Sequence, residues 1–301
     1  MGDRLFRGQI TFAYLVLLLI GSIVLGQGES SGTLLLAKRH SFEIGPEVYY
    51  FDYRELEPWW LSDIFGDIEV MEEDGVFYGV TGAYTYRPWA PSSGERGSNN
   101  SGGLMLRAEG RYAQGEVDYE GSMGGEPLTI SGIDDRTMEF RPLVGLDWFS
   151  EADSLATFYS GFGYRYLNDD SSKFPGGYER ESNYYYLPIG ITGTRRTGGG
   201  WFDSIGGTLE FDFLLSGVQQ SHLSDMGYQD VENDQDTGWG LRASIKFEKR
   251  GKLNFTLEPF VRAWFIAASE TETIYVEGEP VEMYEPKNET VEAGVNLVIR
   301  F

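Results

Sequence analysis

The sequence predicts an all-β fold, a single antiparallel transmembrane β-barrel of about ten strands, with eight or twelve strands as the alternatives. Three observations predict it. Residues 291–301 alternate between an apolar and a mostly polar face, as the side chains of a strand do. About nine further segments show the same period of two. Short and long connections alternate between most of these segments, which is typical of a barrel with short turns at one end and long loops at the other.

Ten segments are expected as strands because each is long enough to cross a bilayer at a tilt. In order they are residues 42–53, 76–87, 104–119, 137–149, 155–167, 183–196, 201–218, 238–247, 253–266 and 290–301. In the ninth segment Leu253, Phe255 and Leu257 share one face. Thr256 and Glu258 share the other. The apolar face is expected to meet lipid and the polar face to line the lumen. The alternative is a soluble periplasmic sandwich or barrel, whose strands are usually shorter.

The connections predict which end faces which compartment. Residues 150–154, 197–200 and 248–252 are short and are expected as periplasmic turns, whereas five other connections run to about 15–24 residues and are expected as outer loops. Pro88 to Gly103 departs from the alternation, either as an ordered periplasmic excursion or through a misplaced strand boundary. An even strand number places both ends of the barrel domain in the periplasm.

The N-terminal residues predict export. Arg4 and Arg7 precede a nearly continuous apolar run from Ile10 to Leu25, which is typical of a Sec signal peptide. We expect a signal peptide over residues 1–26 with cleavage near Gly26, a periplasmic N-terminal segment over 27–41 and the barrel domain over 42–301. A transmembrane anchor is the alternative, although the run is slightly shorter than the ~20 residues a spanning helix needs.

Composition excludes several classes of function. A net charge of -23 disfavours nucleic acid as a partner, because binding phosphates needs a basic face. The absence of cysteine excludes disulfides and thiolate zinc sites, and two histidines are too few for a histidine-rich metal centre. No cofactor is therefore expected, apart from calcium or magnesium at the outer loops.

The expected lumen carries nine acidic and eight basic side chains. A small barrel is usually filled by its own side chains, so these charges are expected either to pair and plug the lumen or to line a narrow, weakly selective path. The lumen candidates are Arg107, Glu109, Arg111, Glu139, Arg141, Glu210, Asp212, Arg242, Glu258 and Arg262.

The expected outer loops hold most of the acidic residues. Such density is typical of a solvated surface, and the alternative is binding of divalent cations by carboxylate oxygens. The best local candidate for metal binding comprises Asp230, Glu232, Asp234 and Asp236, although it lacks the glycine and the final glutamate of a calcium loop. An apolar cluster over 59–65 is expected to cover the barrel mouth or to bind a ligand at the surface.

The apolar run, the connection pattern and the terminal Phe301 together resemble the bacterial outer-membrane β-barrel superfamily, without indicating a subfamily. The resemblance implies a place in the bacterial outer membrane, contact with its lipid and lipopolysaccharide, and Phe301 as a signal read by the barrel assembly machinery. It leaves the oligomeric state open.

Two resemblances suggest chemistry near His222. The triplet His222-Leu223-Ser224 is similar to the lipid A deacylase pattern, with Asp236 nearest to that family's carboxylate. The strand number resembles the omptin proteases, for which His222 and Asp225 are the nearest match to an Asp-His pair. We nevertheless expect no enzyme, but a narrow, weakly selective pore or a structural surface protein. The alternatives are a surface protein that binds a ligand or cation, or is adhesin-like, through its loops, and a lipid or peptide hydrolase that uses His222.

Overall fold

The computed structural model describes residues 37–56, 69–90, 102–123, 126–151, 154–276 and 278–301. The expected signal peptide and the apolar cluster over 59–65 lie outside these ranges. The described strands are β1 (His40–Leu56), β2 (Glu69–Tyr86), β3 (Gly103–Met123), β4 (Glu126–Glu151), β5 (Ser154–Gly161), β6 (Gly163–Asp170), β7 (Glu179–Arg196), β8 (Ser204–Ser221), β9 (Val231–Asp234), β10 (Gly238–Lys249), β11 (Asn254–Ile266), β12 (Glu272–Val276), β13 (Glu279–Met283) and β14 (Lys287–Arg300).

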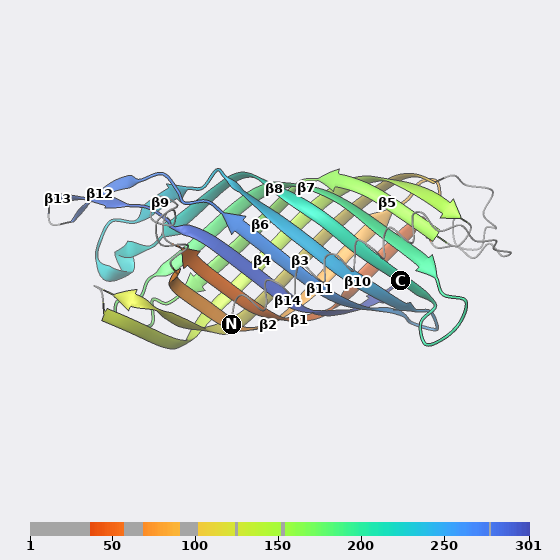
Figure 1. Ribbon diagram of the computed structural model, residues 1–301, viewed down its shortest axis with the longest axis horizontal. Helices are drawn as coiled ribbons and strands as arrows, with labels where there is room; N and C mark the ends of the chain where they lie inside the picture. The colour runs from red at the N-terminus through yellow and green to blue at the C-terminus, as the bar shows by residue number, and fades with distance from the viewer. Residues whose placement is uncertain (1–36, 57–68, 91–101, 124–125, 152–153, 277) are drawn as a thin grey trace.

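The sheet closes on itself into a barrel (Figure 1). β1 pairs with β2 on one side and with β14 on the other, and every pairing in the ring is antiparallel. β5 and β6 form one wall strand interrupted at Phe162, whose N–H donates to the Pro142 carbonyl oxygen at 3.1 Å, and both halves pair with β4 and β7. With β5 and β6 counted together, ten strands form the wall, so the expected fold class is confirmed.

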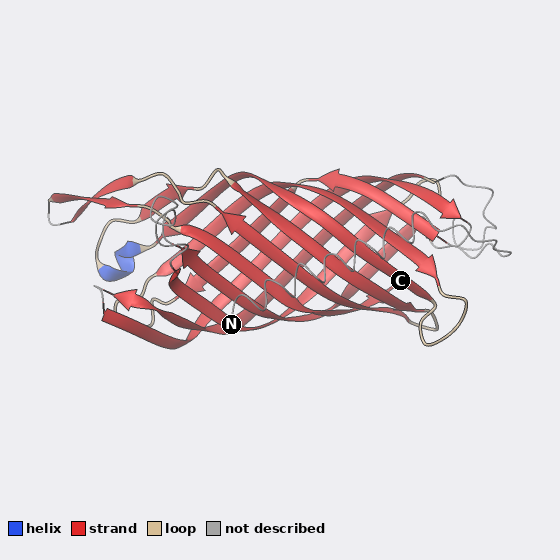
Figure 2. Ribbon diagram, in the orientation of Figure 1, coloured by secondary structure: helices blue, strands red, loops and turns tan. Residues whose placement is uncertain are grey.

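The two ends of the barrel differ. At the end that we call inner, short connections join β7 to β8 and β10 to β11. At the outer end, the wall is extended by β9, by the β12–β13 hairpin and by a short 3-10 helix, η1 (Leu223–Met226) (Figure 2). The described part of the chain contains no helix long and apolar enough to span a membrane.

An apolar belt surrounds the middle of the barrel. Outward side chains such as Ile44, Phe140 and Leu146 are more than half exposed, which is what a lipid-facing surface requires. Toward the outer end the outward positions become charged, for example Glu116 and Asp134. The strand ends beyond the belt therefore lie outside the membrane-spanning segments.

The largest error in the sequence prediction concerns the connection between the third and fourth strands. Residues 120–136 were expected as a loop, but β3 runs to Met123 and β4 starts at Glu126. The alternation continues there, with Ile133 buried in the lumen and a charged Asp134 facing out. Where a strand extends beyond the bilayer, its outward side chains face water and need not be apolar. The end of the apolar face therefore does not mark the end of the strand.

The connection between β2 and β3, which departs from the alternation of short and long connections, is long in the structure as well. β2 ends at Tyr86 and β3 starts at Gly103, so the strand boundaries were placed correctly to within one residue. Its described start is tied to the wall, because Arg87 Nε and Trp89 Nε1 donate to Asp147 Oδ2 at 2.8 and 3.1 Å. At the same end the backbone N–H of Phe301 donates to the carbonyl oxygen of Phe42 at 2.9 Å, which continues the β1–β14 pairing.

Candidate functional site

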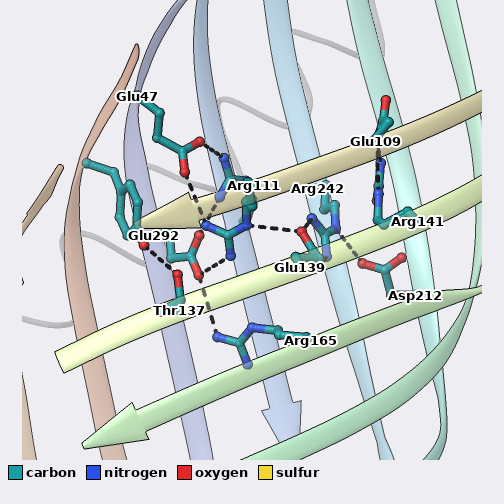
Figure 3. Close-up of polar contacts among 12 residues, drawn as sticks. Glu47, Glu109, Arg111, Thr137, Glu139, Arg141, Arg165, Asp212, Arg242 and Glu292 are labelled. Atoms are coloured by element: carbon teal, nitrogen blue, oxygen red, sulfur yellow. Dashed lines mark hydrogen bonds and ion pairs between the residues drawn. The ribbon is translucent and has the colours of Figure 1, made fainter. Parts of the chain in front are cut away.

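Halfway along the lumen lies a set of charged side chains that we call the central ion-pair layer (Figure 3). Its inward direction follows from strand alternation, because each member stands at a position whose neighbours face lipid. The layer holds five acidic and five basic residues: Glu47, Glu139, Glu210, Asp212 and Glu292, and Arg111, Arg141, Arg165, Arg242 and Arg262. Within this set the two signs are equal in number, and Arg141 Nε also donates to Glu109 Oε2 at 3.0 Å on the inner side of the layer.

One half of the layer is organised around Glu292 on β14. Its carboxylate accepts from Arg111 Nη2 at 2.9 Å and from Arg262 Nη1 at 2.7 Å, and Arg165 Nη2 lies 3.5 Å away. Arg262 Nη2 also donates to Glu47 Oε2 at 2.5 Å. These contacts join β1, β3, β6, β11 and β14, so they cross-link wall strands that lie far apart in the sequence.

The other half is organised around Arg242 on β10. Its Nε donates to Asp212 Oδ2 at 2.7 Å and its Nη1 donates to Glu139 Oε2 at 2.9 Å. Arg111 Nε donates to the same Glu139 oxygen at 3.0 Å, which connects the two halves. Arg141 is paired with Glu210, whose second oxygen accepts from the Tyr159 hydroxyl at 2.7 Å.

Against this layer and on its outer side the lumen is filled by large apolar and aromatic side chains. They form two clusters, Tyr49, Phe51, Phe77, Ala113, Val117, Ile133 and Phe260 in one, and Tyr184, Tyr186, Leu214, Trp264 and Ile266 in the other. The guanidinium of Arg262 lies 3.9 Å from the centre of the Phe260 ring, and that of Arg165 lies 5.5 Å from the Trp264 ring. Such cation–π contacts stabilise buried guanidiniums against aromatic faces.

The filled layers leave no route for water through the middle of the described barrel. A water path would expose the side chains that line it, yet the exposed fractions are 0% for Phe77 and Tyr186 and 1% for Trp264 and Glu292. These residues come from β2, β7, β11 and β14, which stand around the ring. The lumen is therefore occluded at mid-height in this structure.

On the inner side of the central layer the lumen opens into a cavity of about 330 Å³. Arg107, Glu109 and Glu258, the remaining lumen candidates, line it. Arg107 Nη2 donates to Glu43 Oε2 at 2.8 Å, and Lys246 Nζ lies 3.5 Å from Glu258 Oε1. The structure thus brings all ten lumen candidates of the sequence into one connected interior, seven in the central layer and three below it.

Near the outer end the lumen carries a different set of charges, which we call the outer carboxylate cluster. It comprises Glu55, Glu73, Asp135, Asp169 and Glu285, with Arg180 at its centre. Arg180 donates to Glu55 Oε1 at 2.5 Å, to Glu73 Oε1 at 3.4 Å and to Asp169 Oδ2 at 2.9 Å. The Tyr53 hydroxyl donates to Glu55 Oε1 at 3.2 Å and lies 3.5 Å from Glu285 Oε1. The cluster therefore contains five carboxylates and one guanidinium, which bonds to three of them.

The excess of negative charge changes the titration of this cluster. Burial is the largest cause and neighbouring carboxylates add to it, so the pKa of Glu73 and of Asp135 lies well above the usual range. Burial and the nearby charge of Glu55 raise the pKa of Glu285 to about 8. All three groups lie beyond the apolar belt.

His222 contacts carboxylates on both sides. Its Nε2 lies 3.3 Å from Glu181 Oε2 and its Nδ1 lies 4.0 Å from Asp230 Oδ2. Ser224 donates its backbone N–H to Asp230 Oδ1 at 2.7 Å, and Asp225 accepts the backbone N–H of Glu179 at 3.1 Å. These contacts hold the segment around η1 against the start of β7.

The acidic segment after η1 spreads its side chains apart. Asp230 turns toward Ser224 and His222, whereas Glu232 and Asp234 lie on the exposed face of β9 and Asp236 is also exposed. In the described ranges no group of three or more acidic or histidine side chains converges as a set of metal ligands.

Comparison with solved structures shows the same architecture. The outer-membrane protease OmpT of Escherichia coli covers 90% of this chain and all of its own, with a TM-score of 0.57 and 12% sequence identity. The fold is that of a bacterial outer-membrane β-barrel. The translocator domain of the autotransporter NalP from Neisseria meningitidis (TM-score 0.38, 10% identity, 95% of this chain and 96% of that one) and a Pseudomonas aeruginosa FadL homologue (TM-score 0.30, 6% identity, 87% and 90%) are more distant. No family model and no curated protein matches the sequence.

The outer carboxylate cluster was missed at the level of sequence. Glu55 and Glu73 were assigned to the first outer loop because the outward face had already become polar at that point. The signal that could have placed them is the alternation itself, since Tyr53 and Glu55 continue the inward series that begins at Glu43 and Glu47.

Proposed function

We propose that this protein is a non-enzymatic barrel of the bacterial outer membrane whose lumen is occluded, so that it serves as a rigid structural surface protein. The observation that carries the proposal is the water-inaccessible middle of the lumen, where charged and aromatic side chains from around the ring pack together. Of the two expected states of the lumen, a side-chain plug and a narrow path, this geometry supports the plug.

The surroundings of the barrel support the same proposal. The apolar belt fits the hydrocarbon layer, and we propose outer-membrane lipid and lipopolysaccharide as its partners. The strands of the outer end extend the wall beyond the belt and present an acidic rim, which includes Glu116, Asp118 and Asp134. A rigid wall held by cross-lumen ion pairs suits a protein that displays a surface.

A hydrolase that uses His222 has weaker support. General-base catalysis requires the imidazole within hydrogen-bond reach of a nucleophile, and the contacts of His222 are to Glu181 and Asp230 instead. Replacing His222 with alanine is expected to leave any lipid- or peptide-cleaving activity of the purified barrel unchanged. Loss of such an activity in that variant would contradict the proposal.

The proposal is tested by recording single-channel current from the folded protein in planar bilayers at several salt concentrations. Heat-modifiable migration in gels first shows that the protein is folded. We expect a folded protein that gives no discrete current steps. Steps whose size increases with salt concentration would contradict occlusion and support the weakly selective pore.

A further inference from the structure

Two short turns at the inner end lie side by side, and we call them the paired turns. They are residues 195–203, where β7 turns into β8, and residues 249–253, where β10 turns into β11. β8 and β10 are neighbours in the wall. The backbone N–H of Asp203 donates to the Glu248 carbonyl oxygen at 2.8 Å, and the backbone N–H of Arg250 donates to Asp203 Oδ2 at 2.6 Å. The two turns therefore form one continuous surface.

The charge of the paired turns is opposite in sign to that of the chain. The whole sequence has a net charge of -23, whereas these two ranges hold one acidic and five basic residues. The acidic residue is Asp203, whose carboxylate lies 3.2 Å from Lys249 Nζ. The basic residues are Arg195, Arg196, Lys249, Arg250 and Lys252. The paired turns therefore carry an excess of positive charge, which attracts an anionic partner.

Two apolar side chains stand beside these charges and are open to the surroundings. Trp201 is 90% exposed and Leu253 is 60% exposed. Leu253 continues the outward apolar series of Phe255 and Leu257 on β11, so the paired turns adjoin the apolar belt. Tryptophan is enriched at the level of the lipid head groups, where its ring is covered and its N–H stays near water. The paired turns therefore lie at the boundary between the hydrocarbon layer and water.

We propose that the paired turns bind the phosphate groups of anionic phospholipids, with Trp201 and Leu253 inserted among the lipid head groups. Lysine and arginine side chains bind phosphate oxygens through charge-assisted hydrogen bonds. A bilayer fits better than a soluble phosphate, because a soluble anion would leave the two apolar side chains in water. The inference rests on the membrane location in the proposed function and adds the class of lipid. It does not depend on whether the lumen conducts.

The test measures quenching of tryptophan fluorescence by phospholipids with brominated acyl chains. The folded protein is placed in phosphatidylcholine bilayers, and brominated phosphatidylglycerol or brominated phosphatidylcholine is added in equal amounts to both leaflets, so the orientation of the barrel has no effect. Subtracting the signal of Trp201→Phe isolates the quenching of Trp201. We expect Trp201 to prefer phosphatidylglycerol at low salt by at least about fivefold, the effect of one basic residue at an anionic surface. The preference should decrease at high salt, which screens the charges.

Charge variants test whether the paired turns cause this preference. The double variant Lys249→Gln, Lys252→Gln should lower it by about fivefold or more. Lys252→Gln alone removes one exposed charge, and it should lower the preference by less and in the same direction. Lys173→Gln is the matched control, because it removes the same charge from an exposed side chain on the connection between β6 and β7 at the outer end, and it should keep the wild-type preference.

The remaining tryptophans, which include the lipid-facing Trp239, separate two kinds of failure. If both brominated lipids quench them and Trp201 shows no preference, the barrel is in the membrane and this inference is overturned. If neither lipid quenches any tryptophan, the membrane location itself is wrong. The inference is also overturned if the double variant keeps the wild-type preference. Binding to purified peptidoglycan through the same lysines, with no preference among lipids, would assign the paired turns to that polymer instead.

Discussion

The central ion-pair layer and the outer carboxylate cluster are built from the same types of charged side chain, but they differ in the balance of positive and negative charge. In the central layer five carboxylates meet five guanidiniums, and the contacts of Glu292 and Arg242 run from strand to strand across the lumen. In the outer cluster of five carboxylates, Arg180 forms ion pairs with three, Glu55, Glu73 and Asp169. Balance lets buried charges pair and close the lumen, whereas excess leaves carboxylates that take up protons.

The largest effect is expected from breaking the balance of the central layer. Glu292→Gln leaves Arg111, Arg165 and Arg262 without their shared carboxylate, and removing one member of a buried ion pair costs about 3–5 kcal/mol. Urea unfolding of the barrel in lipid bilayers measures this loss. Glu232→Gln on the exposed face of β9 is the matched control and should change the unfolding free energy by less than about 0.5 kcal/mol. Equal losses of unfolding free energy in the two variants would contradict the claim that the buried carboxylate matters more than the exposed one.

A smaller and pH-dependent effect is expected in the outer cluster. Arg180→Met should lower the free energy of unfolding by about 1.5–3 kcal/mol at pH 8, the range for a hydrogen bond to a charged group. At pH 5 the loss should be smaller, because the buried carboxylates of this cluster can take up protons. Denaturant titrations of wild type and variant at both pH values check this. A loss that does not change with pH would mean that the cluster does not titrate.

The titration of Glu285 gives the next effect. Its pKa is about 8 in the folded protein and near 4.5 when unfolded, so the folded state binds the proton more tightly. The resulting stabilisation is complete below about pH 4.5 and is lost as the pH rises through 8, by up to about 1.4 kcal/mol per pH unit. Wild-type stability should therefore fall between about pH 5 and pH 8. The fall should be shallower in Glu285→Gln when unfolding is followed across that range, and an identical slope would contradict the assignment.

The smallest effect is expected at His222, whose contacts with Glu181 and Asp230 are partly exposed. Exposed ion pairs contribute about 0–1 kcal/mol, so His222→Ala should change the unfolding free energy by less than about 1 kcal/mol. The same denaturant titration at pH 7 measures it. A larger loss would show that the η1 segment depends on this imidazole.

Most of the fold prediction rests on the alternation of inward and outward side chains, because this alternation is the same whether lipid or water surrounds the strand. Glu139 and Arg141 could be assigned to the lumen because their neighbours Met138 and Phe140 are apolar and face outward. The pairing of Arg111 with Glu292 could not be predicted, because it depends on which wall strands are opposite one another across the lumen. Glu73 and Asp135 fell outside the expected strands, whose lengths were matched to a bilayer, whereas β2 and β4 extend beyond that length.

The central claim, that balanced charges seal the lumen, is tested most directly by thiol accessibility, since the chain has no cysteine of its own. Thr208→Cys places a thiol in the inner cavity, while Lys252→Cys and Gln229→Cys mark the inner and outer ends. A small membrane-impermeant thiol reagent is added outside vesicles that contain each variant. If the lumen is sealed, the reagent reaches the inner cavity only through the inner end. The labelled fraction of Thr208→Cys should then equal the labelled fraction of Lys252→Cys. Labelling of Thr208→Cys to the sum of the Lys252→Cys and Gln229→Cys fractions would mean that the reagent passes from the outer end, and the lumen would then be open.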